Sequence, residues 1–417
     1  MKSIWLGLLI MAGAGVAARG EVYRTDINPA LRYYQAFNAA QNVPRENHDE
    51  LNTNEWRGRK LTAKFGELVS GYNSAFKLLR KAARTEVPCD WGLDLNEGPE
   101  LLLPHLAQAK GISQMARLRC MWDLQNGRQA EACEDLLATL GLARNLPGDG
   151  TLISVLVQIA MENILISTVA ENFHQFTPES LKQLEEGFAS APARGTVAEA
   201  IAKGESSLPI WLTRKVQEAQ KNHPGNDAAA MAEIRATFQG AVGPGEDGKP
   251  TDITERVMKA AGTSDGLLKL IAAMLPMYER AVTILSLPRA DYEAQIGPFM
   301  AEVQSSPNPL IAEFFPALTK VQPKEFATLT KLAMLRAAVE YKLHGEAGFN
   351  SVKDPTGDGP FTMQRFVFEG VDRGFEIKSP YAGVGYPEVM IFVEKEGVPF
   401  LVWGKHAGEA VDKAGGK

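Results

Sequence analysis

The stretch ISQMARLRCMWDLQNGRQAEACEDLLATLGLARNL, residues 112–146, decides the expected fold. Apolar side chains recur every three or four positions on both sides of Asn126-Gly127, a dipeptide that is typical of a turn. This spacing predicts two helices that fold back on each other as an αα-hairpin. The apolar positions are Met115, Leu118, Met121, Trp122, Leu124, Ala130, Cys133, Leu136, Leu137, Leu140 and Ala143.

The same stretch contains two of the three cysteines of the chain. Cys120 and Cys133 stand almost symmetrically about Gly127, so the hairpin would place both thiols at the same height on adjacent helices. A Cys120–Cys133 disulfide fits this arrangement if the Cα atoms lie within reach, and an oxidising compartment would favour it. The alternative is two buried, unlinked small apolar residues. In either case the odd count leaves at least one thiol free or available to a partner.

Helix signals extend outward from the hairpin, from about residue 28 to residue 345. Several expected starts combine a capping residue with proline at the first helical position, where the missing N–H costs nothing. Three dipeptides fit this pattern well: Asn28-Pro29, Thr177-Pro178 and Asn308-Pro309.

The helices predicted beyond the hairpin are too irregular for a solenoid. No second copy of the 112–146 pattern occurs at the roughly 34-residue period of helical-hairpin repeats. The sequence therefore predicts an irregular stack of helical hairpins, in which the apolar stretch 152–170 is a buried helix. Further helices are expected at about 65–83, 194–222, 226–240, 251–262, 264–286, 289–303, 308–320 and 323–344.

The hydrophobic period changes from helical to alternating after Gly345. Alternating apolar residues at 361–379 and 389–403 predict a three- or four-stranded antiparallel sheet. A sheet this small needs a helix to pack on, and the helix at 329–343 is the obvious one. The expected fold is therefore mainly α, with a helical domain at 21–345, a small β module at 346–405 and a disordered tail at 406–417.

The first twenty residues, MKSIWLGLLIMAGAGVAARG, have the layout of a secretory signal peptide. Lys2 precedes an apolar run that is too short to span a bilayer, and small residues allow cleavage after Ala18 or Gly20. No cysteine follows that run, which argues against a lipid anchor. The mature chain is thus expected to be periplasmic or extracellular, without a transmembrane segment.

Two stretches resemble known families. Leu118, Gly127, Ala130 and Ala132 give the hairpin at 112–146 a pattern similar to a single tetratricopeptide-type hairpin. That resemblance covers about 35 residues and implies a protein-binding helical unit.

A second resemblance covers residues 323–380. A long helix, then DPTGDGPF at 354–361, then GFEIKS at 374–379, resembles the globular tail of type II secretion pseudopilins. It implies a sheet packed on a helix. The resemblance does not imply filament assembly. Pilins begin with a processed hydrophobic helix that carries an early glutamate, and nothing near residue 20 fits that pattern. The whole pattern also resembles uncharacterised secreted helical proteins of bacteria, which adds no activity.

The loop at 89–97 is the first candidate site. Asp90, Trp91, Asp94 and Glu97 combine three carboxylates with an indole, which could bind a sugar or a cation, or supply paired acids for glycoside hydrolysis. The alternative is an interhelical loop whose acids cap the helix expected near Pro99.

Two other clusters have weaker patterns. Asp354, Thr356 and Asp358 could ligate calcium, but the alternating acids and the terminal glutamate of an EF-hand are missing, and a plain Asp-Pro turn is the preferred interpretation. Arg117, Arg119 and Arg128 could form a basic spot on the hairpin, or belong to solvated helix faces.

The remaining sequence argues against several function classes. The six histidines (His48, His105, His174, His223, His344 and His406) show no metal-ligand spacing, and His105 is read as a partly buried structural residue. No nucleophile elbow or phosphate-binding loop occurs, and no cofactor is predicted. A net charge of −6 gives no electrostatic footprint for nucleic acid.

The sequence therefore favours a secreted or periplasmic binding or structural protein that takes a protein or peptide partner in the cell envelope. Stacked helical hairpins form concave surfaces suited to such partners. The alternative is a glycan-acting hydrolase that uses loop carboxylates.

Overall fold

The structure is a computed structural model of the whole chain. It describes residues 24–51, 56–57, 59–205, 207–242, 252–315, 320–357, 359–382 and 387–398. The predicted signal peptide, the predicted tail, Asp358 and the possible fourth strand near residues 400–403 lie outside these ranges.

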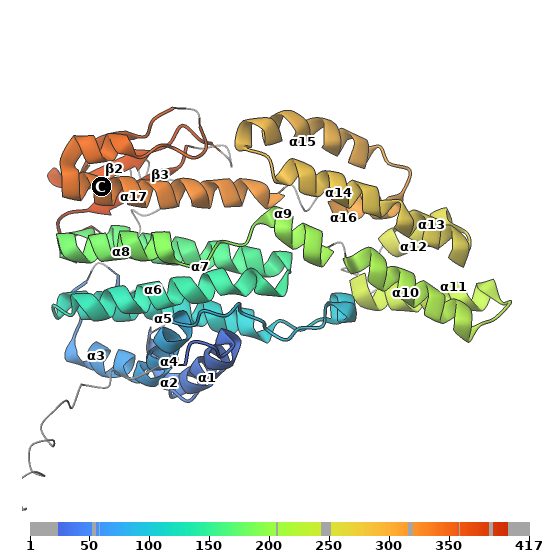
Figure 1. Cartoon of the computed structure of the whole chain (residues 1–417), viewed down its shortest axis with the longest axis horizontal. Coiled ribbons are helices and arrows are strands. Elements are labelled where there is room, and N and C mark those ends of the chain that lie inside the picture. The colour runs from blue at the N-terminus through green and yellow to red at the C-terminus, as the bar shows by residue number, and fades with distance from the viewer. Residues whose placement is uncertain are drawn as a thin grey trace, which may run out of the picture.

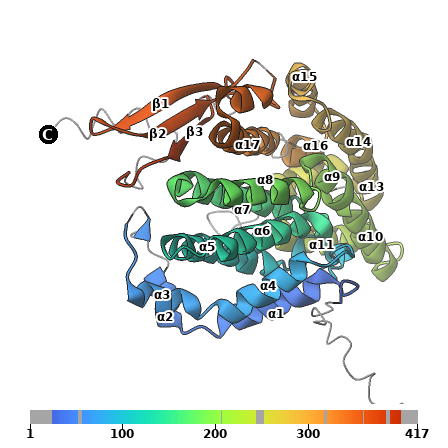
Figure 2. The same ribbon diagram turned by 60° about the vertical axis from the view of Figure 1, so that its left-hand side comes forward.

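Rows of helices stacked on one another form the left-hand part of the molecule in Figure 1. The hairpin α5–α6 lies at the centre of these rows: α5 packs on α3 and α7, α6 packs on α4 and α8, and α4 packs on α1. Figure 2 shows the same rows from another side. We call α1–α8 the hairpin stack; its helices are α1 Pro29–Gln41, α2 Arg45–Leu51, α3 Ala63–Ser70, α4 Asn73–Ala83, α5 Pro104–Gln125, α6 Gln129–Asn145, α7 Leu152–Glu171 and α8 Pro178–Ser190, with short 3₁₀ turns η2 Leu95–Glu100, η3 Leu146–Asp149 and η4 Phe173–Gln175.

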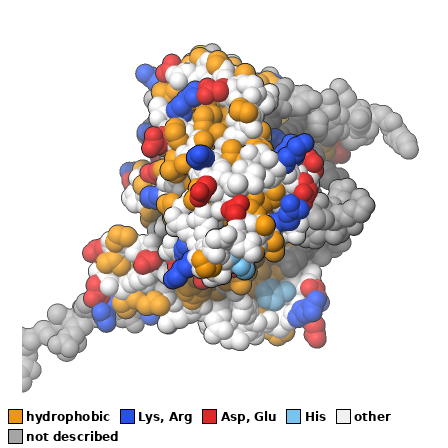
Figure 3. Space-filling view, turned by 90° about the vertical axis from the view of Figure 1, so that its right-hand side faces the viewer, with side chains coloured by type: hydrophobic (Ala, Val, Ile, Leu, Met, Phe, Trp, Pro, Cys, Tyr) orange, Lys and Arg blue, Asp and Glu red, His pale blue; other side chains and the backbone are white. Residues whose placement is uncertain are grey.

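A second helical group occupies the other end of the molecule (Figure 1) and has its own apolar core around Val257, Leu267 and Met274. On the face of that end in Figure 3, basic and acidic side chains are intermingled with apolar surface. The group contains α9 Val197–Ala200, the π-helical turn η5 Ile201–Glu205, α10 Ser207–Asn222, α11 Asp227–Val242, α12 Asp252–Ala261, α13 Ser264–Ala272, α14 Met274–Leu285, α15 Arg289–Gln304 and α16 Pro309–Phe314.

The long helix α17 (Gln322–Ser351) returns from the second group to the hairpin stack and carries the sheet. The sheet has the order β1-β2-β3, with β1 Thr362–Phe368, β2 Val371–Lys378 and β3 Val389–Val393, all antiparallel. Phe375 pairs with Phe392 across β2 and β3, and both rings contact Phe173 of η4. Tyr341 of α17 packs edge-on against Phe375 at 5.1 Å between ring centroids. The predicted fold class, mainly α with a small C-terminal sheet on a helix, is confirmed.

The three predicted proline-containing helix starts are present, and each has its side-chain cap. The Asn28 side chain accepts a hydrogen bond from Ala30 N, that of Thr177 from Ser180 N, and that of Asn308 from Leu310 N. Each cap satisfies an N–H that the first helical turn leaves without a partner.

Several predicted helices have different bounds. The helix expected at 65–83 is divided at Gly71-Tyr72 into α3 and α4. The helix expected at 264–286 is divided at Ala273 into α13 and α14, and the helix expected at 194–222 is interrupted by η5. α17 does not end near residue 344. It continues to Ser351 across a kink at Gly345, where φ is 67°. Glycine adopts this conformation without steric cost, so the residue that looks like a terminator redirects the helix instead.

Helix α7 is long and apolar enough to cross a membrane by length and composition. However, 61% of its most apolar window is buried inside the protein. Its residues Val155, Leu165 and Val169 are completely buried. Packing between α5, α6 and α17 therefore accounts for its apolar character, as predicted.

Of the two arrangements left open for Cys120 and Cys133, the structure has the unlinked one, and Cys89, Cys120 and Cys133 are free thiols. Cys120 and Cys133 are both fully buried in one apolar cluster between α5, α6 and α8. The Cys133 thiol is instead directed to α8, where it donates to the carbonyl of Ser180 at 3.6 Å. Both residues thus fill space as small apolar side chains.

Candidate functional site

A groove of about 600 Å³ runs between α3 and α4 on one side and the α5–α6 turn on the other. We call it the basic groove. It is lined by Gly66, Val69, Ser70, Asn73, Phe76, Lys77, Arg80, Lys81, Arg84, Arg119, Trp122, Asp123, Arg128, Glu131 and Glu134.

The floor of the basic groove is organised by a buried carboxylate. Asp135 of α6 is completely buried, and its two oxygens accept hydrogen bonds from Arg80 Nε at 2.7 Å and Arg119 Nε at 2.8 Å. The Arg119 guanidinium also donates to Asn73 Oδ1 at 2.7 Å and lies 4.6 Å from the centre of the Phe76 ring. Charge-assisted bonds of this kind fix two cationic groups in place.

One wall of the groove is a single face of α4. It carries four basic residues: Arg80, Lys81 and Arg84 lie three, four and seven positions after Lys77. This spacing places all four side chains on the same side of a helix. Lys77 and Arg84 are exposed, and Arg80 and Lys81 are half-buried.

The opposite wall comes from the α5–α6 turn. Arg128 donates to Asp123 Oδ1 at 2.6 and 2.8 Å and lies 5.9 Å from the Trp122 ring. Burial raises the pKa of Asp123 from its ordinary value, and its Oδ2 has no hydrogen-bond partner among the described residues. Glu134 pairs with Arg80 across the groove at 3.0 Å.

The electrostatic balance of the groove is opposite in sign to that of the protein. Six cationic side chains and three carboxylates line it, and Asp135 beneath adds one further negative charge. The groove thus carries a local excess of about two positive charges on a chain whose net charge is −6. Together with the Phe76 and Trp122 rings, this arrangement suits an extended anionic ligand with some apolar surface.

The 89–97 loop does not combine its carboxylates with the indole. The Trp91 side chain is buried, 5% exposed, and stacks on the rings of Tyr33 and His105. Asp90 and Asp94 are exposed, and each accepts a backbone N–H two residues later in the chain. The expected helix start near Pro99 is not present: Asp94 caps the turn η2, and α5 begins at Pro104 without a side-chain cap.

Glu97, the third acid of the loop, lies next to a contact with α10. Glu97 is exposed in the turn η2. The distant helix that reaches this loop is α10, and it contributes Arg214, whose guanidinium donates to the carbonyl of Asn96. Arg214 also pairs with Glu218 of α10 at 3.7 Å, so the cation that α10 brings to this loop is charge-compensated within its own helix.

The proposed calcium ligands form a turn. Asp354 and Thr356 are buried, and Asp354 Oδ1 accepts from the Thr356 N–H at 2.9 Å, while Oδ2 accepts from the Ser379 hydroxyl. These hydrogen bonds use both oxygens of the Asp354 carboxylate and connect the end of α17 to the sheet. Within the described ranges no group of three or more potential metal-ligating residues occurs.

His105 is more deeply buried than predicted. Its ring is completely buried, stacks on Trp91 at 4.5 Å between ring centroids, and holds Nε2 3.4 Å from Asp149 Oδ2. Asp149 also accepts hydrogen bonds from Ser154 and the Thr151 N–H. The cluster connects the start of α5 to the start of α7 within the core.

The arginines predicted as a basic spot divide between two faces. Arg119 and Arg128 line the basic groove, whereas Arg117 points to α7, where its Nε donates to Thr168 Oγ1 at 3.3 Å. Burial lowers the pKa of Arg117 to about 10. Sequence reasoning missed the basic face of α4, although its spacing would have revealed it.

No protein-family model matches the chain, and comparisons with curated proteins and with solved structures give no significant match.

Proposed function

We propose that this is a helical binding protein of the cell envelope whose basic groove takes an acidic segment of a partner protein. The observation that carries the proposal is the local positive excess in the basic groove of an otherwise acidic protein. The secretory layout of residues 1–20 supports the location. The hydrolase alternative has no comparable support among the described residues.

The fixed and the exposed cations of the groove have different roles. Arg80 and Arg119 are held by Asp135, so they set the potential of the floor without being displaced. Lys77 and Arg84 are exposed on the wall and would contact carboxylates of the partner. Exposed ion pairs contribute about 0.2–1 kcal/mol each, so useful affinity requires several acids in one segment.

The apolar surface of the groove adds selectivity for a peptide over a simple anion. The Trp122 ring is half-buried at the groove wall, next to Gly66. A side chain that covers its exposed part would bury apolar area worth about 25 cal/mol per Å². We therefore expect an acidic peptide with an aromatic or aliphatic residue to bind more tightly than a purely acidic one.

The test is fluorescence anisotropy with a labelled peptide of about ten residues that contains several glutamates and one leucine. We expect binding that weakens between about 50 and about 300 mM NaCl, because salt screens exposed charges. The double variant Lys77→Glu/Arg84→Glu should bind about tenfold more weakly, a loss of about 1.4 kcal/mol.

The matched control makes the same charge change on the second helical group. Lys259 and Lys269 are exposed on α12 and α13, and Lys259→Glu/Lys269→Glu should change the affinity less than about twofold. Equal losses in the two double variants would show only a response to net charge. That result would refute the groove as the binding site.

A further inference from the structure

A second groove, of about 500 Å³, lies between α8 and α17. We call it the α8–α17 groove. Residues of these two helices form most of its lining, and the neighbouring helices α6 and α7 contribute Arg144 and Val169. Its volume is within the range of sites for small organic molecules.

The lining of this groove is mainly apolar. Ten of its fourteen residues have apolar side chains, and the other four are charged. Phe188, Leu329, Leu332 and Ala333 belong to the apolar set and are only half-buried. Because the groove is concave, a hydrocarbon body that enters it would remove this apolar surface from water.

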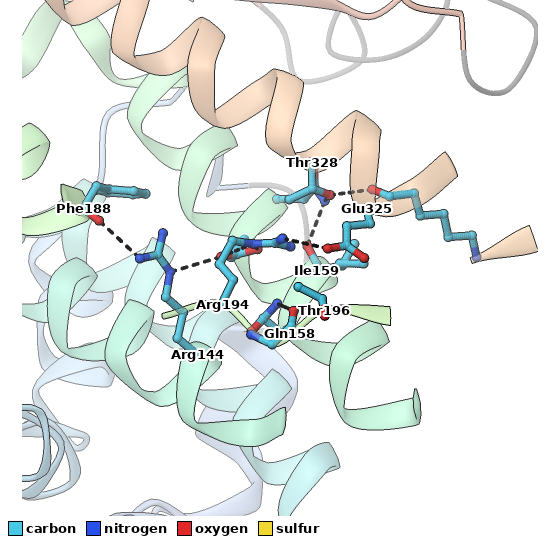
Figure 4. A network of polar contacts seen from close by, with 12 residues as sticks. Arg144, Gln158, Ile159, Phe188, Arg194, Thr196, Glu325 and Thr328 are labelled. Atoms are coloured by element: carbon cyan, nitrogen blue, oxygen red, sulfur yellow. Dashed lines mark hydrogen bonds and ion pairs between the residues drawn. The ribbon is translucent and has the colours of Figure 1, made fainter. Parts of the chain in front are cut away.

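The guanidinium of Arg144 is held in a fixed orientation beside the groove. Its side chain is 10% exposed, and its Nε donates to Glu162 at 3.3 Å. Its Nη1 donates to the carbonyls of Phe188 and Pro192, both at 3.2 Å. Figure 4 shows dashed lines from two nitrogens of this guanidinium, one of which reaches Phe188. The third nitrogen, Nη2, has no hydrogen-bond partner among the described residues.

This third nitrogen can be reached by a ligand. Arg194 Nη2 also lacks a partner, but it is enclosed in the protein. Arg144 Nη2 is not enclosed in this way, and the Arg144 side chain lines the groove. An acceptor that enters the groove can therefore bind to its N–H donors.

The charge of Arg144 is only partly compensated. Its carboxylate partner, Glu162, is shared with Arg194, which lies closer to it at 2.9 Å. Arg194 has a second carboxylate, that of Glu325 at 3.6 Å, whereas Arg144 has no second one among the described residues. Arginine is suited to carboxylates because its N–H groups form charge-assisted hydrogen bonds with them.

The acids that line the groove have cationic partners of their own. Glu185 of α8 pairs with Arg336 of α17 at 3.2 Å, and Glu186 pairs with Lys182 at 3.9 Å. These ion pairs leave Arg144 as the lining cation that shares its carboxylate with another arginine. A single anionic group would complete the site.

We infer that the α8–α17 groove binds a small carboxylate with a hydrocarbon tail, of the fatty-acid class. The carboxylate accepts hydrogen bonds from Arg144 Nη2, and the tail lies against Leu332 and Phe188. Because three hydrogen bonds already hold the guanidinium, binding does not have to order it, which favours affinity.

Titration calorimetry on the full chain tests this inference with octanoate, neutral octanamide and octylammonium, three probes of nearly one shape. We expect saturable binding of octanoate that is at least about tenfold tighter than that of the other two. Hexanoate should bind about tenfold more weakly than octanoate, because the groove covers two fewer methylene groups. Equal affinities of octanoate and octanamide, tighter binding of octylammonium, or no saturable binding of octanoate would overturn the inference.

The variant Arg144→Lys tests the anchoring group. It keeps a cation for Glu162 but removes Nη2, so octanoate should bind about tenfold more weakly, whereas octanamide should be little affected. The matched control is Arg235→Lys at an exposed position of α11, which should leave octanoate binding unchanged.

Two further comparisons locate the tail and exclude the basic groove. Ala333→Trp fills the α8–α17 groove and should abolish octanoate binding, whereas Ala301→Trp at an exposed position of α15 should preserve it. Lys77→Glu/Arg84→Glu should also preserve it. Unchanged affinity in Arg144→Lys and Ala333→Trp, each with a folded circular dichroism spectrum, or loss of binding in Lys77→Glu/Arg84→Glu, would place octanoate elsewhere and refute the assignment.

Discussion

Replacing Glu162 with glutamine is the sharpest test of how α6, α7 and α17 are held together. Glu162 is completely buried and is the shared acceptor of Arg144 and Arg194. Removing one member of a buried ion pair typically costs about 3–5 kcal/mol, because the partner charge is left uncompensated.

The structure places the expected loss at the lower end of that range. Arg144 keeps hydrogen bonds to the carbonyls of Phe188 and Pro192, both at 3.2 Å, and Arg194 keeps Glu325 at 3.6 Å. We therefore expect Glu162→Gln to lower the free energy of unfolding by about 3 kcal/mol. With a urea dependence of about 3 kcal/mol per molar, the midpoint falls by about 1 M.

Urea unfolding followed by circular dichroism measures this loss. The control is Glu255→Gln, which breaks the exposed pair between Arg235 and Glu255 and should cost less than about 1 kcal/mol. If Glu162→Gln cost no more than this control, the buried network would contribute little, and the reasoning from burial and shared acceptors would be refuted.

Three further predictions follow from single groups. Burial raises the pKa of Glu325 above its ordinary value of 4.5. The wild type should therefore lose stability relative to Glu325→Gln as the pH rises from about 4.5 through the higher pKa of the folded protein. A difference in urea midpoint that does not change with pH would contradict this. Non-reducing mass spectrometry should find the Cys120 and Cys133 thiols free, and a linked 120–133 peptide pair would contradict the structure. Because burial raises the pKa of Cys133 to about 11, its thiol should also be slow to alkylate until the protein unfolds. Gly204→Ala places a Cβ 2.3 Å from a backbone carbonyl oxygen and should cost about 1–3 kcal/mol in thermal unfolding, whereas Gly111→Ala in open space should stabilise α5 by up to about 1 kcal/mol.

Local signals in the sequence were sufficient for most of the fold. Asn28, Thr177 and Asn308 mark helix starts because a cap is satisfied within a few residues of the capping side chain. The change of hydrophobic period after Gly345 likewise predicts the sheet, since alternation is a property of each strand. The predicted end of α17 was wrong because a glycine is compatible with a kink in a helix as well as with its C-terminal end. The packing of the turn after Gly345 decides between the two.

The candidate sites depend on contacts between distant segments, and for this reason they could not be predicted from spacing alone. Asp135 and Arg80 are 55 positions apart, and neither carries a local sign of the other. Trp91 looked available to a ligand because its neighbours are acidic. Its ring instead stacks on the rings of Tyr33 from α1 and His105 from α5. Short-range patterns report the faces of helices, whereas a groove exists only after two faces meet.

Polar contacts also explain why a cavity of about 590 Å³ between α9, α14 and α17, which we call the junction cavity, stays open. Apolar faces attract each other without direction, so a purely hydrophobic junction between α9, α14 and α17 would approach until the space was filled. Ion pairs and hydrogen bonds instead hold groups at set distances. Glu325 is bound to Arg194 on one side and to the Val197 N–H on the other, and Arg289 joins the start of α15 to the carbonyl of Thr356. These bonds fix α17 relative to α9 and α15, and the apolar side chains between them line a space that they cannot close.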